Sequence, residues 1–235
     1  MYGYYYFDYT YFLFVIPALL LSLYAQIRVQ SSFNKYSKVK SSRNITAADA
    51  AKKVLSQNGI TDIRIEHISG NLTDHFDPRD KVIRLSDSVY NSTSVAAVGV
   101  ACHEAGHAVQ NAVGYVPIKF RQILVPITQF SSKLSIPLIL IGLLLPTSWD
   151  FMVYIGIALF GIAVLFELVT LPVEFNASSR AIKALEESYI LYDDELDGAR
   201  KVLKAAALTY LASMVSAVLT LLRFIVIAGN RRGND

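Results

Sequence analysis

The sequence predicts a multi-pass α-helical membrane protein with about four transmembrane helices and a small α+β domain in the cytoplasm. Apolar residues make up 53% of the 235 positions, above the roughly 45–50% of a usual soluble domain. They gather in long runs, and a helix needs about 20 apolar residues to cross a hydrocarbon core about 30 Å thick. The net charge of +3 gives no sign of nucleic-acid binding, and the single cysteine, Cys102, excludes a disulfide within the chain.

Four apolar runs are long enough, or nearly long enough, to cross a membrane: Tyr9–Ile27, Leu134–Pro146, Phe151–Val173 and Ala205–Ala228. The second is short, but its helix could begin near Ile123. A tight turn at 146–150 makes the second and third runs a helical hairpin. The first run lacks a basic segment before it and a cleavage site after it, which predicts a retained anchor instead of a signal peptide. Tyr2, Tyr4, Tyr5 and Tyr6 suit a membrane interface.

Lysine and arginine residues lie after the first run, before the second, and between the third and fourth. Because positive residues favour the cytoplasmic side, we expect residues 28–133 and 174–204 in the cytoplasm and the N-terminus outside. Arg231 and Arg232 would then lie outside, so a reversed topology stays open. The expected segments are 1–28 (first helix), 29–133 (α+β segment), 134–173 (hairpin), 174–204 (helical segment) and 205–235 (last helix and tail).

Local signals predict the elements of the cytoplasmic domain. Thr46 caps a helix over 47–58 that Gly59 ends, and Ser94 caps a helix over 95–113 that Gly114 ends. The alternating segments 63–68 and 81–85 predict two strands that pair as a hairpin. Residues 74–78 are turn-rich and are predicted to lie between those strands.

The helix from Val95 carries the pattern His-Glu-x-x-His at His103, Glu104 and His107. This spacing places two imidazoles one turn apart on one face, where both can bind one Zn²⁺. Catalytic zinc keeps an open position for water and lowers its pKa from about 15.7 toward about 7. Glu104 would take a proton from this water and return it to the leaving amine. The alternative is a plain helix with two solvated or paired histidines, but burying them in this apolar helix without a partner is costly.

Glycine in the middle of this helix, at Gly106, indicates a close neighbour, because glycine costs about 1 kcal/mol there. Glu174, where the third run ends, is the best candidate for a third ligand, and Pro172 would kink or restart the helix beside it. A solvated carboxylate at a helix start is the alternative for Glu174. The substitutes as third ligand are Glu167, Asp74 and Asp77.

An oxyanion opposite the metal would need a stabilising group. His75, Tyr210 and Arg180 are candidates that the sequence does not separate, and the turn around His75 could equally be structural. We expect His67 to have a structural role in its strand. Cys102 lies about 100° around the helix from His103, so it is expected to be a small core residue and not a ligand.

Three stretches, 70–79, 94–110 and 170–181, resemble the YugP-like zinc metallopeptidases, a bacterial membrane family, and the likeness runs over most of the chain. The last stretch is also similar to the Glu-Phe-x-Ala-Asp motif of the HtpX and CAAX-protease group of gluzincins. The resemblance implies a zincin-like domain, Glu174 as third zinc ligand and a location in the bacterial cytoplasmic membrane. Ser178 stands where that motif has Asp, so a carboxylate that orients a ligand histidine is missing or supplied from elsewhere.

The leading hypothesis is a zinc metalloendopeptidase that cuts peptide or protein substrates near the cytoplasmic face of the lipid bilayer. Two alternatives come from other classes. One is a zinc-binding membrane adaptor without catalysis, although Glu104 would then serve no purpose. The other is a metal transporter that uses Glu167 and Arg223 as charges inside the membrane.

Overall fold

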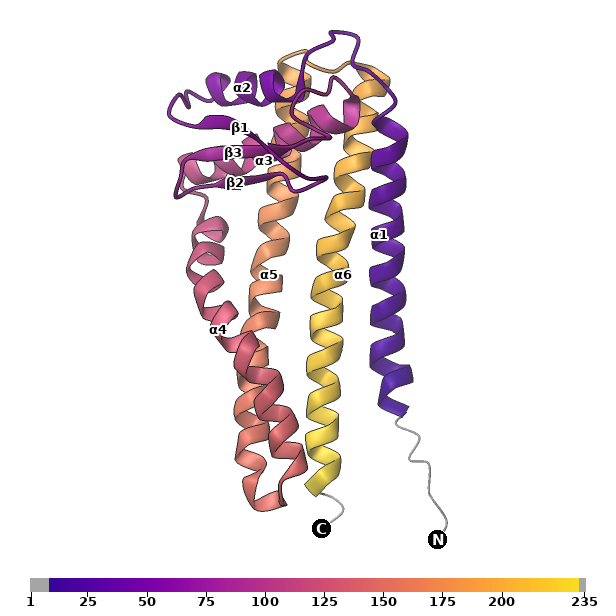
Figure 1. The fold of residues 1–235 in the computed structure, drawn as a ribbon, viewed down its shortest axis with the longest axis vertical. Coiled ribbons are helices and arrows are strands. Elements are labelled where there is room, and N and C mark those ends of the chain that lie inside the picture. Colours follow the sequence, from indigo (N-terminus) through magenta and orange to yellow (C-terminus); the bar gives the residue numbers. More distant parts are fainter. Residues whose placement is uncertain (1–8, 233–235) are drawn as a thin grey trace. The chain divides into compact units, whose positions relative to one another are not determined.

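The computed structural model describes residues 9–232 and is mostly helical, with one small sheet (Figure 1). The tyrosines at positions 2, 4, 5 and 6, which were predicted to lie at a membrane interface, are outside this range. Four described helices are long and apolar enough to cross a membrane, as predicted: Tyr11–Tyr36, Val116–Leu144, Thr147–Glu187 and Asp193–Arg231. The chain divides into two compact units. We call residues 1–24, 121–169 and 210–235 the helical unit, and residues 25–120 and 170–209 the mixed unit.

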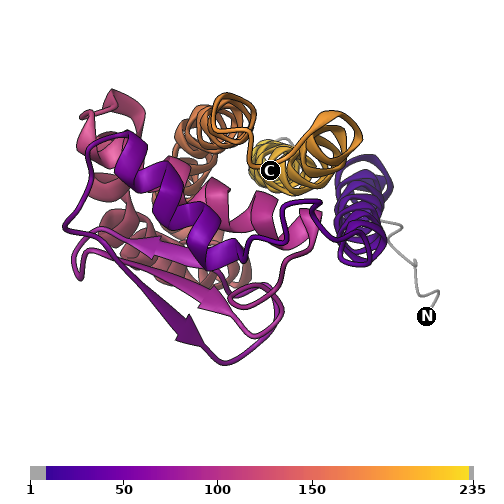
Figure 2. The ribbon, with the colours of Figure 1, turned by 90° about the horizontal axis from the view of Figure 1, so that it is seen from above.

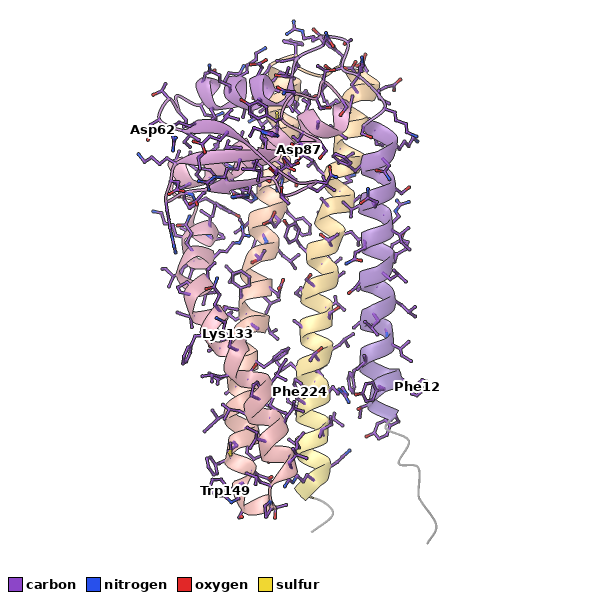
Figure 3. All side chains as sticks on the ribbon, in the orientation of Figure 1. Phe12, Asp62, Asp87, Lys133, Trp149 and Phe224 are labelled. Carbon is purple, nitrogen blue, oxygen red and sulfur yellow. The ribbon has the colours of Figure 1, made fainter. Side chains whose placement is uncertain are left out.

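The helical unit contains η1 (Tyr11–Val15), the start of α1 (Ile16–Tyr36), most of α4 (Val116–Leu144), η2 (Thr147–Trp149), and parts of α5 (Asp150–Glu187) and α6 (Asp193–Arg232). The predicted hairpin is formed by α4 and α5, with Trp149 at the turn (Figure 3). Glycines allow these helices to pack closely, since a Cβ on Gly156 would lie 2.8 Å from the Ser135 carbonyl oxygen. Phe160 and Phe224 join α5 to α6 by an edge-to-face contact with centroids 5.5 Å apart.

Arg231, whose charge counted against the predicted topology, is bound inside the helical unit. Its guanidinium donates to the carbonyl oxygens of Gly142, at 2.7 Å, and Leu145, both at the end of α4. Gly142 is in the last turn of α4 and Leu145 directly follows the helix, in the region where backbone carbonyls have no partner within a helix. The Arg231 Nε lies 3.3 Å from a carboxylate oxygen of the buried Asp150. The positive charge is therefore neutralised by the fold.

Helix bounds around the prolines differ from the prediction. α4 begins at Val116, because Pro117 falls in its first turn, where proline is tolerated. α5 runs without interruption from Asp150 to Glu187 through Pro172. Of the kink or restart predicted at this proline, the restart is therefore wrong. Proline removes one backbone donor, and packing against neighbouring helices can offset this cost.

The mixed unit contains a three-stranded sheet in the order β1-β3-β2. β1 (Arg64–Ile68) is parallel to β3 (Val82–Ser86), and β2 (His75–Asp77) is antiparallel to β3. The predicted hairpin between residues 63–68 and 81–85 is therefore wrong, and the predicted turn at 74–78 contains β2. The chain turns after β1 at Gly70 and Leu72, which both have positive φ. It turns again after β2, where Asp77 accepts a hydrogen bond from the Arg79 backbone N–H.

Helices α2 (Ala47–Gln57) and α3 (Val95–Ala112) lie on the same side of the sheet (Figure 2). Both begin and end within a residue of the prediction. Thr46 accepts a hydrogen bond from the Asp49 N–H at 3.1 Å, and Ser94 accepts one from the Ala97 N–H at 3.2 Å. Gly59 and Gly114, with φ of +69° and +68°, follow the helix ends. α3 is almost wholly buried and forms the centre of the core.

Candidate metal centre

The imidazoles of His103 and His107 lie side by side on one face of α3, as the spacing predicted. Their ring centroids are 4.7 Å apart and the rings are nearly perpendicular. Glu174, on the part of α5 within the mixed unit, reaches both of them. Its Oε2 lies 3.2 Å from Nε2 of His103 and 3.4 Å from Nε2 of His107. α3 and α5 thus bring together side chains that are far apart in the sequence. His103 and Glu174 are separated by 71 residues.

These three residues are the only group of metal-ligating side chains within residues 9–232 whose donor atoms all lie within 4.8 Å of one another. Zinc binds nitrogen and carboxylate oxygen at about 2.0–2.1 Å, so neighbouring corners of its tetrahedron are about 3.3 Å apart. The two distances from Glu174 Oε2, 3.2 and 3.4 Å, match that edge. Two imidazoles and a carboxylate leave a fourth position open, so the donor set fits a catalytic zinc ion.

The other ring nitrogens of the two histidines have partners of their own. Nδ1 of His103 lies 3.1 Å from the Ser178 hydroxyl oxygen, and Nδ1 of His107 lies 3.0 Å from Oε1 of Gln110. Both Nε2 atoms consequently face Glu174. A hydroxyl thus stands where the sequence had suggested a missing carboxylate. Gln110 was missed by the sequence analysis, although its position three residues after His107 places it on the same helix face.

Glu104 is buried, at 8% exposure, and its negative charge acts on both Asp74 and His107. Burial raises the pKa of Asp74, and the negative charge of Glu104 adds to this. Asp74 is held by the backbone N–H and the hydroxyl of Ser86, at 2.7 and 3.0 Å. Asp74 therefore supports the loop before β2. Neither Asp74 nor Asp77 belongs to the ligand group.

In the metal-free protein, the environment of His107 favours a second proton on its ring. Burial by itself lowers the pKa of His107, but the hydrogen bond to Glu174 and the charges of Glu104 and Glu174 raise it by more. The ring has an acceptor at each nitrogen, Gln110 Oε1 at Nδ1 and Glu174 Oε2 at Nε2. A proton on Nε2 occupies the position that a metal would take.

The remaining candidates from the sequence are not members of the ligand group. His75 is exposed on β2, with Nδ1 2.9 Å from the Thr73 carbonyl oxygen. His67 bonds to Asp87 at 2.7 Å. Arg180 donates from Nε to the side-chain oxygen of Asn176 at 2.8 Å. Burial raises the pKa of the Cys102 thiol to about 12, which keeps it protonated and agrees with a core role. Tyr210 and Glu167 belong to the helical unit.

Comparison with known proteins identifies the family. A family model described as "Putative neutral zinc metallopeptidase" matches residues 11–229. The chain belongs to this family. It is 44% identical over 220 residues to the "Putative membrane protease YugP" of Bacillus subtilis (strain 168), which covers 94% of this chain and 97% of that protein. No solved structure matches.

Membership of the family confirms the resemblance seen in the sequence. It implies zinc as the cofactor, peptides as the substrate class and a membrane setting. The four apolar helices agree with a multi-pass membrane protein. The buried group of His103, His107 and Glu174 could bind the zinc ion that this family uses.

Proposed function

We propose that this protein is a membrane-embedded zinc metalloendopeptidase that hydrolyses peptide bonds near the cytoplasmic face of the membrane. His103, His107 and Glu174 are the zinc ligands and Glu104 is the general base. The observation that carries the proposal is the pair of 3.2 and 3.4 Å distances from Glu174 Oε2 to the two imidazole nitrogens. They match the edges of a zinc tetrahedron, and all three side chains are buried.

Zinc, when bound, would supply Lewis acidity to a water molecule and to the peptide carbonyl. Glu104, next to His103 and buried, accepts a proton from the attacking water and passes it to the leaving amine. Ser178 and Gln110 hold the two imidazoles by their Nδ1 atoms. Because the site is buried, the charge of Glu104 is screened less than at the surface, which strengthens its action on the reacting groups.

An extended substrate can bind along the edge of β2. The sheet order β1-β3-β2 leaves the backbone of β2 hydrogen-bonded to β3 on one side only. β2 follows Asp74 directly, and the pKa of Asp74 responds to the charge of Glu104, so this edge starts close to the proposed base. A peptide added there as a strand would bind through its main chain, which suits a protease that acts on varied sequences.

The location that we propose is the cytoplasmic membrane of a bacterium, with the mixed unit and its zincin-like fold in the cytoplasm. The proposed segments are those expected from the sequence: 1–28, 29–133, 134–173, 174–204 and 205–235. Most lysines and arginines are in the mixed unit. The binding of Arg231 by Asp150 supports this topology, since the charge that spoke against it is neutralised.

The topology can be tested by labelling single cysteines in intact cells with a membrane-impermeant maleimide. Cys102→Ala provides a background without cysteine. In it, we expect Ser148→Cys, in the exposed η2, to be labelled and Ser37→Cys, exposed after α1, to be protected until the cells are lysed. The opposite pattern would show a reversed topology.

The catalytic proposal is tested with Glu104→Gln in the full, zinc-loaded chain, purified in detergent and offered a quenched fluorogenic peptide library. We expect zinc content to equal that of the wild type, because Glu104 does not bind the metal, and turnover to fall at least about 100-fold. Glu187→Gln, at an exposed position, is the matched control and should keep full activity. Undiminished turnover by Glu104→Gln would refute the mechanism, and zinc binding without hydrolysis by the wild type would favour the adaptor.

A further inference from the structure

Gln110 is fully buried at the end of α3 and has hydrogen-bond partners for its whole amide group. Its Oε1 lies 3.0 Å from Nδ1 of His107. Its Nε2 donates to the Val173 carbonyl oxygen at 2.7 Å and to the Asn176 side-chain oxygen at 3.0 Å. Each of the two amide hydrogens thus has an acceptor, and both acceptors are on α5, one residue before and two residues after Glu174 in the sequence.

The donor and acceptor groups of the side chains fix the direction of each hydrogen bond in the series from Arg180 through Asn176 and Gln110 to His107. An arginine side chain offers only donors, so Arg180, with Nε 2.8 Å from Asn176, forces the amide oxygen of Asn176 toward it. That oxygen and the Val173 carbonyl can only accept, so the Gln110 nitrogen must face them. The remaining Gln110 oxygen then faces His107 and can only accept. Nδ1 of His107 must therefore carry a proton.

We propose that Gln110 is a positioning residue that holds His107 with Nδ1–H toward its amide oxygen and the Nε2 lone pair toward the metal, and that Arg180 fixes this polarity through Asn176. The inference rests on the proposed role of His107 as a zinc ligand. An imidazole whose Nδ1–H donates to an acceptor is a more basic ligand, and the hydrogen bond fixes the orientation of its ring.

His103 is held differently. Its Nδ1 lies 3.1 Å from the Ser178 hydroxyl, and a hydroxyl can either donate or accept. Ser178 therefore does not by itself decide which nitrogen of His103 carries the proton. Within the described part of the chain, the two ligand histidines thus differ in that only His107 is linked to a fixed cation.

Two variants of Gln110 separate positioning from packing. Gln110→Leu fills the space but offers no acceptor to His107, so we expect the Kd for zinc to rise about 10–100-fold. Gln110→Glu keeps an acceptor for Nδ1–H but loses both donors to α5, so it should unfold at a lower temperature than the wild type yet bind zinc at least as tightly. Zinc affinity is measured on the full chain in detergent by competition with a chromophoric chelator.

A spectroscopic signature gives a second readout. The chain has four histidines, so ¹⁵N-histidine labelling yields a simple ring spectrum. In zinc-loaded wild type and Gln110→Glu, we expect a downfield, slowly exchanging Nδ1 proton that disappears in His107→Ala. In Gln110→Leu this proton should lose its downfield shift. Equal zinc affinity in wild type and Gln110→Leu, or equal weakening in both Gln110 variants, would overturn the proposal.

The Asn176 variants keep the test open if Gln110→Leu does not fold. Asn176→Asp retains an acceptor for Arg180 and Gln110 and should keep the wild-type zinc affinity. Asn176→Leu removes this acceptor, so zinc should bind more weakly than in the wild type. The loss of affinity should be smaller than in Gln110→Leu, because the Val173 carbonyl still orients the Gln110 amide. Arg180→Leu should have a smaller effect again. Identical affinities for the two Asn176 variants would contradict the relay. None of these readouts involves hydrolysis, so they are independent of the test of Glu104.

Discussion

Gly106 and Ala177 lie at the close approach of α3 and α5 beside the candidate metal centre: a Cβ on Gly106 would lie 2.6 Å from the Ala177 carbonyl oxygen. Gly106 lies between Glu104 and His107, and Ala177 follows Glu174 by three residues. Because Gly106 has no side chain, α3 and α5 can approach closely enough for Glu174 to contact both imidazoles. The sequence predicted a close neighbour at this glycine, and the structure identifies it.

Gly106→Ala should consequently separate α3 from α5. Since the obstacle is backbone, the helices must move, and we expect a loss of about 1–3 kcal/mol in stability together with much weaker zinc binding. Zinc per protein and the unfolding temperature are the measurements. Gly161→Ala is the control, because nothing lies within 4 Å of a Cβ there and zinc binding should not change. Full zinc binding by Gly106→Ala would show that the close approach is not needed.

Substitution of Glu174 should prevent the protein from binding one zinc ion per chain. Its carboxylate oxygen is the atom shared by both contacts to the histidines, so Glu174→Ala leaves two ligands only. Metal content after gel filtration is compared with that of wild type and of Glu167→Ala. The latter should retain zinc, since Glu167 is outside the ligand group. Equal zinc in Glu174→Ala and wild type would remove Glu174 from the coordination of the metal.

Alanine and aspartate at position 178 should affect zinc affinity differently. Ser178→Ala leaves Nδ1 of His103 without its 3.1 Å partner and should weaken zinc binding about 10-fold. Ser178→Asp offers a charged acceptor, which orients the ring and makes it more basic, so zinc should bind as tightly as in wild type or more tightly. Chelator competition measures both. A tighter Ser178→Ala would contradict this role of the hydroxyl.

Zinc affinity should fall with decreasing pH, beginning above the range expected for an ordinary histidine. The pKa of His107 is raised in the metal-free protein, so its ring already binds a proton where a free histidine, with a pKa of about 6.5, would be neutral. Zinc must displace that proton, and affinity is therefore lost as pH drops through the raised pKa. A titration of zinc affinity against pH checks this. A midpoint below that of free histidine would contradict it.

Arg231 and Asp150 should stabilise the helical unit without affecting the metal. Arg231→Met leaves the buried Asp150 carboxylate without its 3.3 Å partner, and we expect a loss of about 3 kcal/mol. Lys133→Met, on an exposed position of α4 (Figure 3), is the control and should change stability little. Unfolding in detergent gives the difference, and zinc content should stay at the wild-type level. Equal stability of both variants would argue against the buried pair.

The sequence alone determined the features that depend on local chemistry or on the thickness of a membrane. Four long apolar runs predicted four helices, and Thr46 and Ser94 marked helix starts that the structure confirms. The spacing of His103 and His107 placed their rings on one face, because a helix repeats every 3.6 residues. Glu174 was the best candidate for a third ligand from its position at the end of the third apolar run, and the motif resemblance strengthened that prediction.

Tertiary structure decided what depends on contacts between distant segments. The β1–β3 pairing is parallel, since the chain passes through β2 on the far side of β3, and alternation of side chains does not specify direction. α5 continues through Pro172. Gln110 acquires its role only where α5 presents Val173 and Asn176 to it. Caps and periodicity act over a single turn, whereas a metal centre assembled from α3 and α5 exists only when those helices pack together.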